Sequence, residues 1–283
     1  MNKILVLGSN SQIGKELKLL KNNIFIFKSK SELNLKYTRK IINFLVKNKI
    51  KTVINLAAYT DVERAEMEKK QCLNINFQWI KSLLESIKRN NLRIFFIQIS
   101  TDFVFGNNKD LVSENDKTNP LNFYGKTKLM TEEYINNNYT NSLIIRTSSV
   151  FSIYNKNFLK NLVIALLNNK KVGINTKIKT RPTSARSIAN FINDVIKQKV
   201  YPIGIVHFTN KPSISWFKFA KTIENLLPKK YRNNVFINNE YKTKAKRPLN
   251  SILKYSIKIK HIRNQDKWLE YLKKDITSFK YEK

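Results

Sequence analysis

Cysteine, glycine and proline are scarce in this chain of 283 residues, which contains one, six and six of them. The single Cys72 excludes an intramolecular disulfide framework and a cluster of metal-binding thiolates, which is typical of a protein from a reducing compartment. With so little glycine and proline there is no flexible linker, so two lobes should lie in close contact. No stretch approaches the roughly 18 consecutive apolar residues that a membrane span needs, and we expect a cytoplasmic protein that does not bind membranes.

Acidic residues are also few, since 20 Asp and Glu stand against 53 Lys and Arg, and the formal net charge is +33. Such a charge raises the question of nucleic-acid binding. The basic residues, however, are spread from Lys3 to Lys283, and the sequence has no zinc-ligand set and no RNP-like aromatic motif. We therefore expect no specific nucleic-acid partner, and only a general attraction for anions, including anionic small substrates.

The first half of the chain alternates short apolar runs with amphipathic stretches, which is the pattern of a parallel sheet built from βαβ units. Strands are predicted at 3–8, 24–27, 52–58, 93–100 and 142–148. Amphipathic stretches lie between them near 38–48, 63–90 and 120–137. We predict an α/β fold in which a Rossmann-like, doubly wound parallel sheet occupies residues 1–149.

Beyond about residue 150 the pattern is less regular. Helices are predicted near 157–169, after Pro182 and at 215–227, with a short strand at 204–209. Residues 150–283 should form mainly a smaller C-terminal substrate-binding lobe, with some segments returning to the sheet domain.

The first predicted strand ends in GSNSQIG, residues 8–14, where a helix begins. Glycines at such a turn allow backbone amides to approach a pyrophosphate, and the helix N-terminus favours negative charge. Gly8 and Gly14 fit this pattern, which indicates a dinucleotide site. Ser11 stands where a middle glycine is usual, so an ordinary strand-to-helix turn remains the alternative.

The segment KSKSELNL follows the second predicted strand, where dinucleotide enzymes usually choose between their cofactors. An acid there accepts the ribose hydroxyls, whereas a basic or small residue leaves room for a 2′-phosphate. Lys28 and Lys30 therefore favour NADPH slightly over NADH. Asn34 and Leu35 are expected at the adenine edge.

Four further stretches together resemble the dTDP-4-dehydrorhamnose reductases, a branch of the extended short-chain dehydrogenase/reductases. They are NLAAYTDVERAE (55–66), ISTDFVF (99–105), NPLNFYGKTKLMTEE (119–133) and RTSSVF (146–151). The resemblance includes the turn, where Gln12, Ile13 and Gly14 match, and continues to Trp268, so that it covers nearly the whole chain. It implies that a nucleotide-activated keto-sugar is reduced by hydride from NADPH or NADH.

The stretch FYGKTK contains the only Tyr-xxx-Lys spacing in the chain, at Tyr124 and Lys128. The resemblance implies that Tyr124 is the proton donor and that Lys128 tunes it and holds the nicotinamide ribose. A nearby ammonium favours the phenolate, so we expect a pKa of Tyr124 brought down toward neutrality. Asn119 as cap and Pro120 in the first turn would place both side chains on one helix face.

The remaining site residues also follow from matching this chain to the family. Thr101 is the hydroxyl that orients the substrate carbonyl, with Ser100 as the alternative. The substrate side is completed by Asp102 and Ser149. Besides Tyr124 and Lys128, the expected cofactor residues are Gly8, Ser11, Gln12, Ile13, Gly14, Asn34, Leu35, Ala57, Ala58, Tyr59 and Thr60.

The chain departs from the family in its sugar pocket, because Phe103 and Ser149 stand where a tyrosine and a tryptophan are usual. Loss of the tryptophan removes a stacking surface for the sugar, so the sequence leaves both the sugar and the nucleotide base open. Some relatives bind magnesium through acidic residues at a dimer interface. No such residues can be placed here, so we predict no metal and regard a homodimer as an open expectation.

Three other functions remain open at this stage. An epimerase or dehydratase of the same superfamily would retain bound NAD, although Phe103 replaces the second carboxylate that is usual in dehydratases. A non-catalytic regulatory relative would keep the fold and the cofactor site. A nucleic-acid-binding role is the weakest, and its test is whether binding persists at moderate salt.

Overall fold

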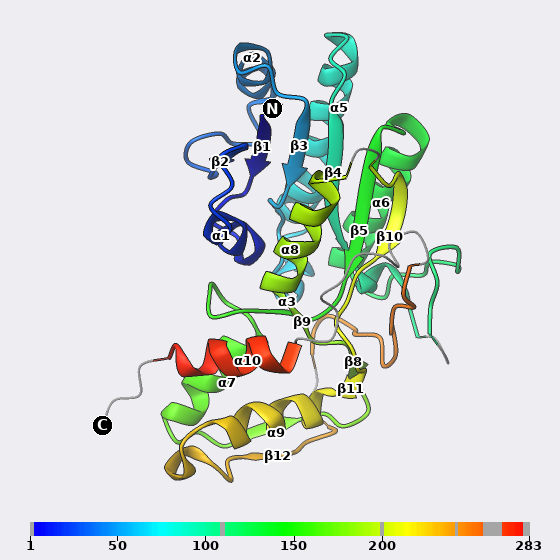
Figure 1. Ribbon diagram of the computed structural model, residues 1–283. Coiled ribbons are helices and arrows are strands. Elements are labelled where there is room, and N and C mark those ends of the chain that lie inside the picture. The colour runs from blue at the N-terminus through cyan, green and yellow to red at the C-terminus, as the bar shows by residue number, and fades with distance from the viewer. Residues whose placement is uncertain (1–2, 108–110, 199–200, 241–242, 257–267, 280–283) are drawn as a thin grey trace.

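The centre of the molecule is a six-stranded parallel sheet with the order β10-β5-β4-β3-β1-β2 (Figure 1). The computed structural model describes residues 3–107, 111–198, 201–240, 243–256 and 268–279. The strands are β1 (Ile4–Leu7), β2 (Phe25–Lys28), β3 (Thr52–Asn55), β4 (Phe95–Thr101), β5 (Ser142–Thr147) and β10 (Gly204–His207). The chain runs outward from β1 to β2 and then returns to β3, which creates the crevice where open α/β sheets bind ligands. The predicted Rossmann-like parallel sheet is confirmed.

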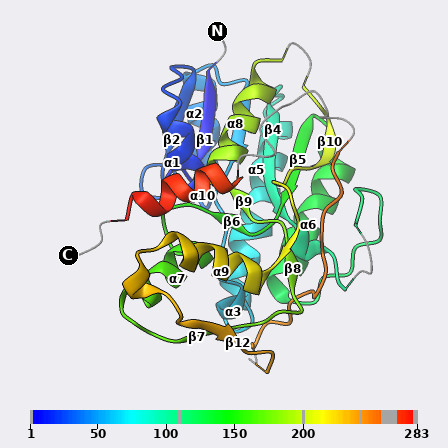
Figure 2. The ribbon, with the colours of Figure 1, turned by 60° about the horizontal axis from the view of Figure 1, so that its bottom comes forward.

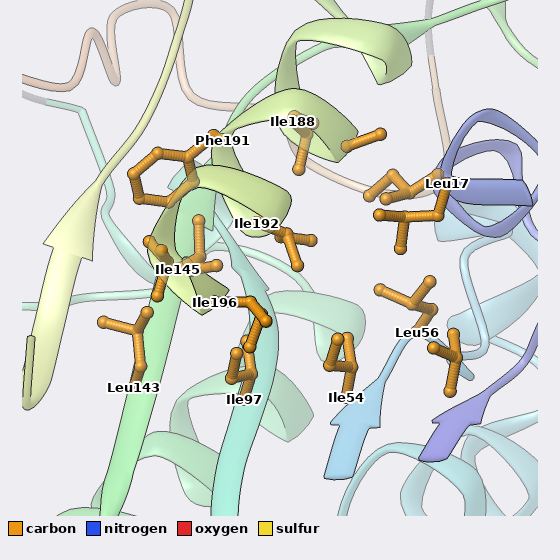
Figure 3. Packing of buried hydrophobic residues seen from close by; sticks show 14 of the residues in the cluster. Leu17, Ile54, Leu56, Ile97, Leu143, Ile145, Ile188, Phe191, Ile192 and Ile196 are labelled. Atoms are coloured by element: carbon orange, nitrogen blue, oxygen red, sulfur yellow. The ribbon is translucent and has the colours of Figure 1, made fainter. Parts of the chain in front are cut away.

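Helices cover both faces of the sheet because alternate strand residues point to opposite sides. Ile4 and Val6 face α1 (Gln12–Leu19) and α8 (Ala185–Ile196), whereas Leu5 and Leu7 belong to the core under the other helices. Figure 3 shows Phe191 and Ile192 of α8 packed over the strands. The other face is covered by α2 (Thr38–Lys47), α5 (Trp79–Arg89) and α6 (Phe123–Asn138).

The amphipathic stretch predicted at 63–90 is not one helix but four consecutive pieces. These are α3 (Val62–Ala65), α4 (Lys69–Leu73), the π-helical turn η1 (Asn74–Gln78) and α5. π-Helical turns inside helices often occur at functional sites, because they turn side chains away from the regular helical face. Here the turn carries Asn76, which is fully buried.

A smaller lobe lies at the carboxyl ends of the strands (Figures 1 and 2). Its core is formed by three helices with largely apolar inner faces, α7 (Phe158–Leu167), α9 (Trp216–Leu226) and α10 (Trp268–Thr277). Three short strand pairs complete it: β7 (Val172–Ile174) with β12 (Val235–Ile237), β8 (Lys179–Thr180) with β11 (Ile214–Ser215), and β6 (Val150–Phe151) with β9 (Thr183–Ser184). The 3-10 turns are η2 (Asp102–Val104) and η3 (Lys229–Tyr231).

The C-terminal half also contributes to the sheet domain. Helix α8 packs on the sheet and β10 pairs with β5, although both follow residue 150. The division of the chain at residue 150 stays a prediction. Among the described helices, none has both the length and the apolar character required to cross a membrane.

Candidate active site

A cleft of about 950 Å³ opens at the carboxyl ends of β1, β2 and β3. Nine of the predicted cofactor residues line it: Gly8, Ser11, Gln12, Asn34, Leu35, Ala57, Ala58, Tyr59 and Thr60. Ile13 and Gly14 are buried beneath it, Ile13 in the core between α1 and the sheet. The cleft also includes Lys30, Asp61, Arg64, Glu68 and Lys156.

The turn from β1 to α1 is shaped to hold a phosphate group. Gly8 has φ +73°, and a Cβ there would lie 2.5 Å from the backbone nitrogen of Ala57. A Cβ on Gly14 would lie 2.5 Å from the carbonyl oxygen of Ser9. Ser11 is the helix cap, because its Oγ accepts a hydrogen bond of 3.1 Å from the Gly14 amide. This close-packed turn at a helix N-terminus fits the pyrophosphate of a dinucleotide.

The segment after β2 presents basic and hydroxyl groups to the cleft. Lys30 and Ser31 line it. Glu32, the one acid of this segment, accepts a 2.7 Å hydrogen bond from the Ser29 amide and lies 3.5 Å from Nζ of Lys28. The backbone amide of Ser29, then its side chain and, more weakly, Lys28 hold the pKa of Glu32 well below its usual range. The predicted role of Lys28 and Lys30 in choosing the cofactor stays a prediction.

The structure brings Thr101 and Tyr124 together where β4 ends. The Thr101 side chain hydrogen-bonds to Tyr124, and its Oγ1 lies 3.2 Å from Oδ1 of Asp102. Helix α6 approaches η2 closely, because a Cβ on Gly125 would collide with the carbonyl oxygen of Phe103. The rings of Phe103 and Tyr124 meet edge to face at 6.1 Å. The absence of a side chain at Gly125 therefore allows Tyr124 to reach the strand end.

Helix α6 begins later than predicted. Its N-cap is Asn122, whose Oδ1 accepts a 2.8 Å hydrogen bond from the Gly125 amide. Asn119 instead donates its amide to the carbonyl of Val104, so the prediction of Asn119 as cap and Pro120 in the first turn is wrong. Tyr124 and Lys128 still lie one helical turn apart.

The expected direction of the pKa shift of Tyr124 is also wrong. Burial raises its pKa, and Asp102 raises it further, whereas the hydrogen bond from Thr101 acts in the opposite sense. Lys128 donates from Nζ to the carbonyl of Ile99 at 2.6 Å, and burial lowers its own pKa to about 8. Tyr124 is therefore a neutral phenol at neutral pH, which is the form that can donate a proton.

Asp102, predicted on the substrate side, is buried beside Thr101. Its Oδ2 accepts a 2.7 Å hydrogen bond from the Ser251 hydroxyl, which comes from the C-terminal part of the chain. Burial raises the pKa of Asp102 to about 7, although the hydrogen bonds from Ser251 and Thr101 oppose the shift. The carboxyl group therefore takes up a proton far more readily than an exposed aspartate does.

The two other predicted serines have different surroundings. Ser100 donates its hydroxyl to Glu132, two helical turns beyond Tyr124 on α6, so it does not replace Thr101. Ser149 has φ +44° and its hydroxyl contacts that of Thr180. It lies outside the set of residues that line the cleft.

Sequence reasoning missed Asn76, which links the loop after β3 to helix α6. Its Oδ1 accepts a 2.8 Å hydrogen bond from the Tyr59 amide, and its Nδ2 donates to Oγ1 of Thr127 at 3.1 Å. An asparagine in the middle of an amphipathic helical pattern was the available signal. Gly125 was signalled similarly, as one of only six glycines, placed directly after the candidate tyrosine.

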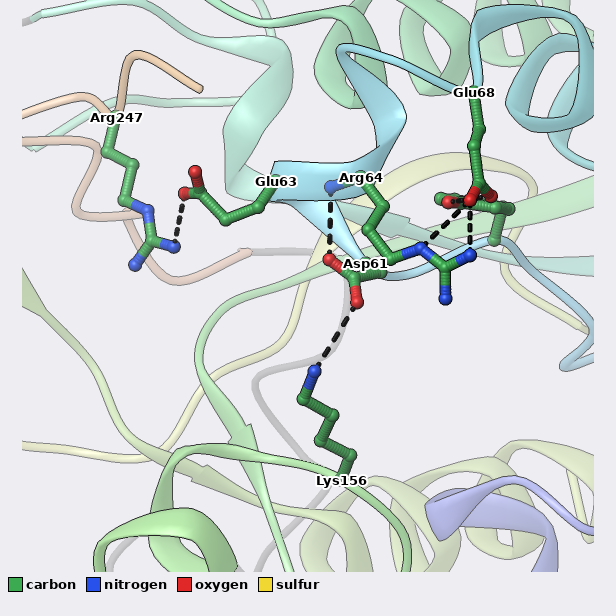
Figure 4. Close-up of polar contacts among 7 residues, drawn as sticks. Asp61, Glu63, Arg64, Glu68, Lys156 and Arg247 are labelled. Atoms are coloured by element: carbon green, nitrogen blue, oxygen red, sulfur yellow. Dashed lines mark hydrogen bonds and ion pairs between the residues drawn. The ribbon is translucent and has the colours of Figure 1, made fainter. Parts of the chain in front are cut away.

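Two ion pairs connect the lobe to the loop and helix beside the cleft (Figure 4). Lys156 lies 3.5 Å from Asp61, and Arg247 lies 2.9 Å from Glu63 of α3. On the same side Arg64 pairs with Glu68, which also accepts a 2.6 Å hydrogen bond from the Tyr59 hydroxyl. The lobe is thus held against the segment that lines the first cleft.

A second cleft of about 560 Å³ lies in the lobe. Phe158 and Trp216 form an aromatic wall, with their rings edge to face at 4.2 Å. The polar and charged lining residues are Lys171, Asn175, Asn238, Thr243 and Arg247. An aromatic wall with basic and amide groups suits a flat polar ring that carries negative charge nearby. Within the described ranges, no three His, Cys, Asp or Glu side chains are grouped so that they could hold a metal ion.

The sequence matches, over residues 1–280, the family described as RmlD substrate binding domain. The dTDP-4-dehydrorhamnose reductase of Aggregatibacter actinomycetemcomitans is 32% identical over 268 residues, covering 89% of this chain and 90% of that protein. The dTDP-4-dehydrorhamnose reductase of Clostridium acetobutylicum has a solved structure with a TM-score of 0.87 at 30% identity, covering 97% of this chain and 98% of that one. That of Bacillus anthracis, solved in complex with NADP, has a TM-score of 0.88 at 25% identity, covering 99% and 100%.

Proposed function

The chain belongs to the RmlD substrate binding domain family, and we propose that it is an NADPH- or NADH-dependent oxidoreductase that reduces a nucleotide-activated 4-keto-6-deoxy sugar. The substrate we propose first is dTDP-4-dehydro-L-rhamnose, which would be converted to dTDP-L-rhamnose for polysaccharide synthesis. One observation carries the proposal. Tyr124 hydrogen-bonds to Thr101 at the end of β4, and Lys128, one helical turn further on, donates to the carbonyl of Ile99 in the same strand, beside a cleft built like a dinucleotide site.

The chemistry of the chain's own residues follows from this geometry. A reduced nicotinamide, when bound in the first cleft, supplies the hydride. Thr101 and Tyr124 share a hydrogen bond, so a carbonyl oxygen placed between them receives two donors as negative charge develops on it. The protonated phenol of Tyr124 then gives up its proton to that oxygen. Lys128, held on the carbonyl of Ile99, stabilises the phenolate that is left.

We assign the nucleotide part of the substrate to the cleft in the lobe. The rings of Phe158 and Trp216 offer a wall for the base, and Lys171 and Arg247 offer charge to a diphosphate. The Nε of Arg247 is buried without a hydrogen-bond partner in the part of the chain that the structure describes, so this N–H is available to an anion. A sugar leading from this cleft toward Thr101 would pass Asp102.

The test is to mix the purified protein with dTDP-4-dehydro-L-rhamnose and NADPH, then NADH, and to follow the absorbance of the reduced cofactor. We expect oxidation with product formation, and loss of both in Tyr124→Phe. A rate no higher than that of Tyr124→Phe with either cofactor would contradict the proposal. Tightly bound NAD in the purified protein, with interconversion of two nucleotide sugars, would favour the epimerase instead.

Compartment and assembly are part of the same proposal. A cytoplasmic location agrees with a single cysteine, which is free and buried. We propose a homodimer without a specific nucleic-acid partner, and sedimentation at two salt concentrations, with and without DNA, tests both points. Binding that persists at moderate salt would contradict the second.

A further inference from the structure

Helix α6 holds the last three residues of β4 one by one. Lys128 donates from Nζ to the carbonyl of Ile99 at 2.6 Å. Glu132, one turn further along the helix, accepts the hydroxyl of Ser100. Tyr124, one turn before Lys128, hydrogen-bonds to Thr101. The strand end and the helix are thus aligned at three successive turns, and the alignment sets the position of Thr101 relative to Tyr124.

The Glu132 carboxylate is fixed by a third element of the fold. Arg146 of β5 donates to it from Nε at 3.1 Å and from Nη2 at 2.7 Å. The side chain of Glu132 is 1% exposed and that of Arg146 is 3% exposed. Arg146 lies over the ring of Phe105 at 4.9 Å and is 3.3 Å from Nε2 of His207. One carboxylate therefore connects α6, β4 and β5 in the interior.

Stability alone does not explain such a pair. Two charges lose their hydration when they are buried, and well-packed apolar residues of similar volume often stabilise a protein equally well. A buried ion pair does, however, define a direction and a distance between the elements that carry it. Catalysis depends on such definition, because a misplacement of about 1 Å can cost on the order of 100-fold in rate.

We propose that Glu132, held by Arg146, is a positioning residue for the reductase: it fixes β4 against α6 so that Thr101 faces Tyr124, and places a negative charge one turn from Lys128. This inference rests on the proposed function for its catalytic readout. It does not depend on that function for the binding readout given below.

The charged neighbours of this cluster are few. Lys128 is faced by Glu132 from α6 and by Cys72 from α4. Asp102 and Cys72 act in turn on Tyr124, one helical turn before Lys128. Glu132 favours the charged form of Lys128 and so opposes the effect of burial. Arg146 and, behind it, His207 of β10 face Glu132 from the other side. Removing the charge of Glu132 should therefore lower the pKa of Lys128, whereas removing the charge of Arg146 should raise it.

The experiment compares Glu132→Gln and Arg146→Gln with Glu133→Gln, an exposed position on the same helix, as the matched control. In Glu132→Gln the charge of Arg146 is left unbalanced, so the alkaline limb of kcat/KM should shift down by about one pH unit. In Arg146→Gln the unbalanced carboxylate should shift the limb upward. Both variants should lose about 10- to 100-fold in kcat with KM nearly unchanged, and Glu133→Gln should match the wild type.

A second readout avoids the sugar substrate. The affinity for NADPH, measured by fluorescence between pH 6 and pH 10, should show the same opposite shifts, because Lys128 is placed to meet the nicotinamide ribose. Opposite shifts in affinity without any turnover would leave the positioning role intact and contradict only the proposed reaction. Thermal unfolding of each variant shows whether it is folded. If Arg146→Gln is not, Glu132→Gln carries the pH test, and Arg146→Lys, which keeps the charge, is measured for its loss of kcat.

Two results would overturn the inference. One is a pair of folded variants whose pH profiles coincide with that of the wild type. The other is a shift of both profiles in the same direction, as expected from general loosening of the fold. Recovery of the wild-type pH profile, but not of kcat, in Arg146→Lys would support it, because that variant restores the charge without the paired hydrogen bonds.

Discussion

The two clefts of the molecule are built in different ways. The cleft of the sheet domain is framed by parallel strands of a six-stranded sheet, and the candidate catalytic groups beside it have buried partners such as Asp102 and Glu132. The cleft of the lobe rests on strand pairs of two or three residues, and its charged groups, such as Arg247, are partly exposed. The first arrangement suits chemistry that tolerates little displacement, and the second suits recognition that can change with the ligand.

The largest expected effect concerns the proton donor. Tyr124→Phe should lower kcat by about 1,000-fold, since general acid catalysis contributes roughly 100- to 10,000-fold. The affinity for NADPH should stay within about threefold, because the phenol hydroxyl is placed for the substrate. Steady-state kinetics and cofactor fluorescence measure the two quantities. Equal losses in kcat and in NADPH affinity would mean that Tyr124 serves cofactor binding as much as proton donation.

A second prediction compares one glycine from each region. In Gly125→Ala the new methyl group meets the backbone of Phe103, so kcat should fall by about 100-fold and the free energy of unfolding by about 2 kcal/mol. In Gly173→Ala the methyl group meets the side chain of Asn238 at 2.6 Å. We therefore expect the free energy of unfolding to fall by about 1 kcal/mol and KM for the nucleotide sugar to rise. Denaturant unfolding measures the two losses of stability, and steady-state kinetics measures the changes in kcat and KM. A larger loss of stability in Gly173→Ala than in Gly125→Ala would show that the lobe is the more rigid part.

Removal of a charge from the lobe should act on substrate binding alone. Arg247→Ala should raise KM for the nucleotide sugar about tenfold, by loss of a charge-assisted hydrogen bond, while kcat and NADPH affinity change little. Lys246→Ala, the exposed neighbour, is the matched control. A large fall in NADPH affinity would show instead that the pair with Glu63 transmits its effect to the first cleft.

The smallest effect is a pH dependence of the wild type. Burial lowers the pKa of Lys128 from 10.5 to about 8, so kcat/KM should fall by about half at pH 8 as the ammonium loses its proton. Stability should change in the other direction. Between pH 8 and 10.5 the folded state binds fewer protons at this site than the unfolded state, so the free energy of unfolding rises relative to Lys128→Met, by at most about 3 kcal/mol. Parallel declines of activity and stability would contradict the assignment of the limb to Lys128.

Local patterns in the sequence predicted the frame of the sheet cleft but not its fine geometry. Apolar runs located the strands, and the 8–14 turn located the cleft, because these depend on neighbours along the chain. The cap of α6 was misplaced since Asn119 and Asn122 both satisfy the local rule, and only the contact of Asn119 with Val104 decides. The direction of the pKa shift was missed because burial depends on distant segments.

The lobe was less predictable for a related reason. Its strands are too short to produce a periodic pattern, and its cleft is assembled from segments that are far apart in the chain, such as Phe158 and Arg247. The pair of Glu132 and Arg146 likewise joins two segments whose contact no local pattern in the sequence predicts. Arg146 within the apolar run of β5 was the only local sign that a buried partner must exist.

Helix α6 approaches residue 103 through the backbone of that residue, which leaves its side chain open to change. Helix α6 is seated at Gly125 on the backbone carbonyl of residue 103, which every amino acid possesses, and not on the side chain. A substitution that keeps an aromatic ring, and with it the edge-to-face contact with Tyr124, should therefore leave Tyr124 and Thr101 in place. A tyrosine or a phenylalanine at this position would present different surfaces to the sugar in the predicted pocket without altering the proposed proton transfer. Substrate preference could thus drift by single substitutions in a lineage whose reaction stays constant.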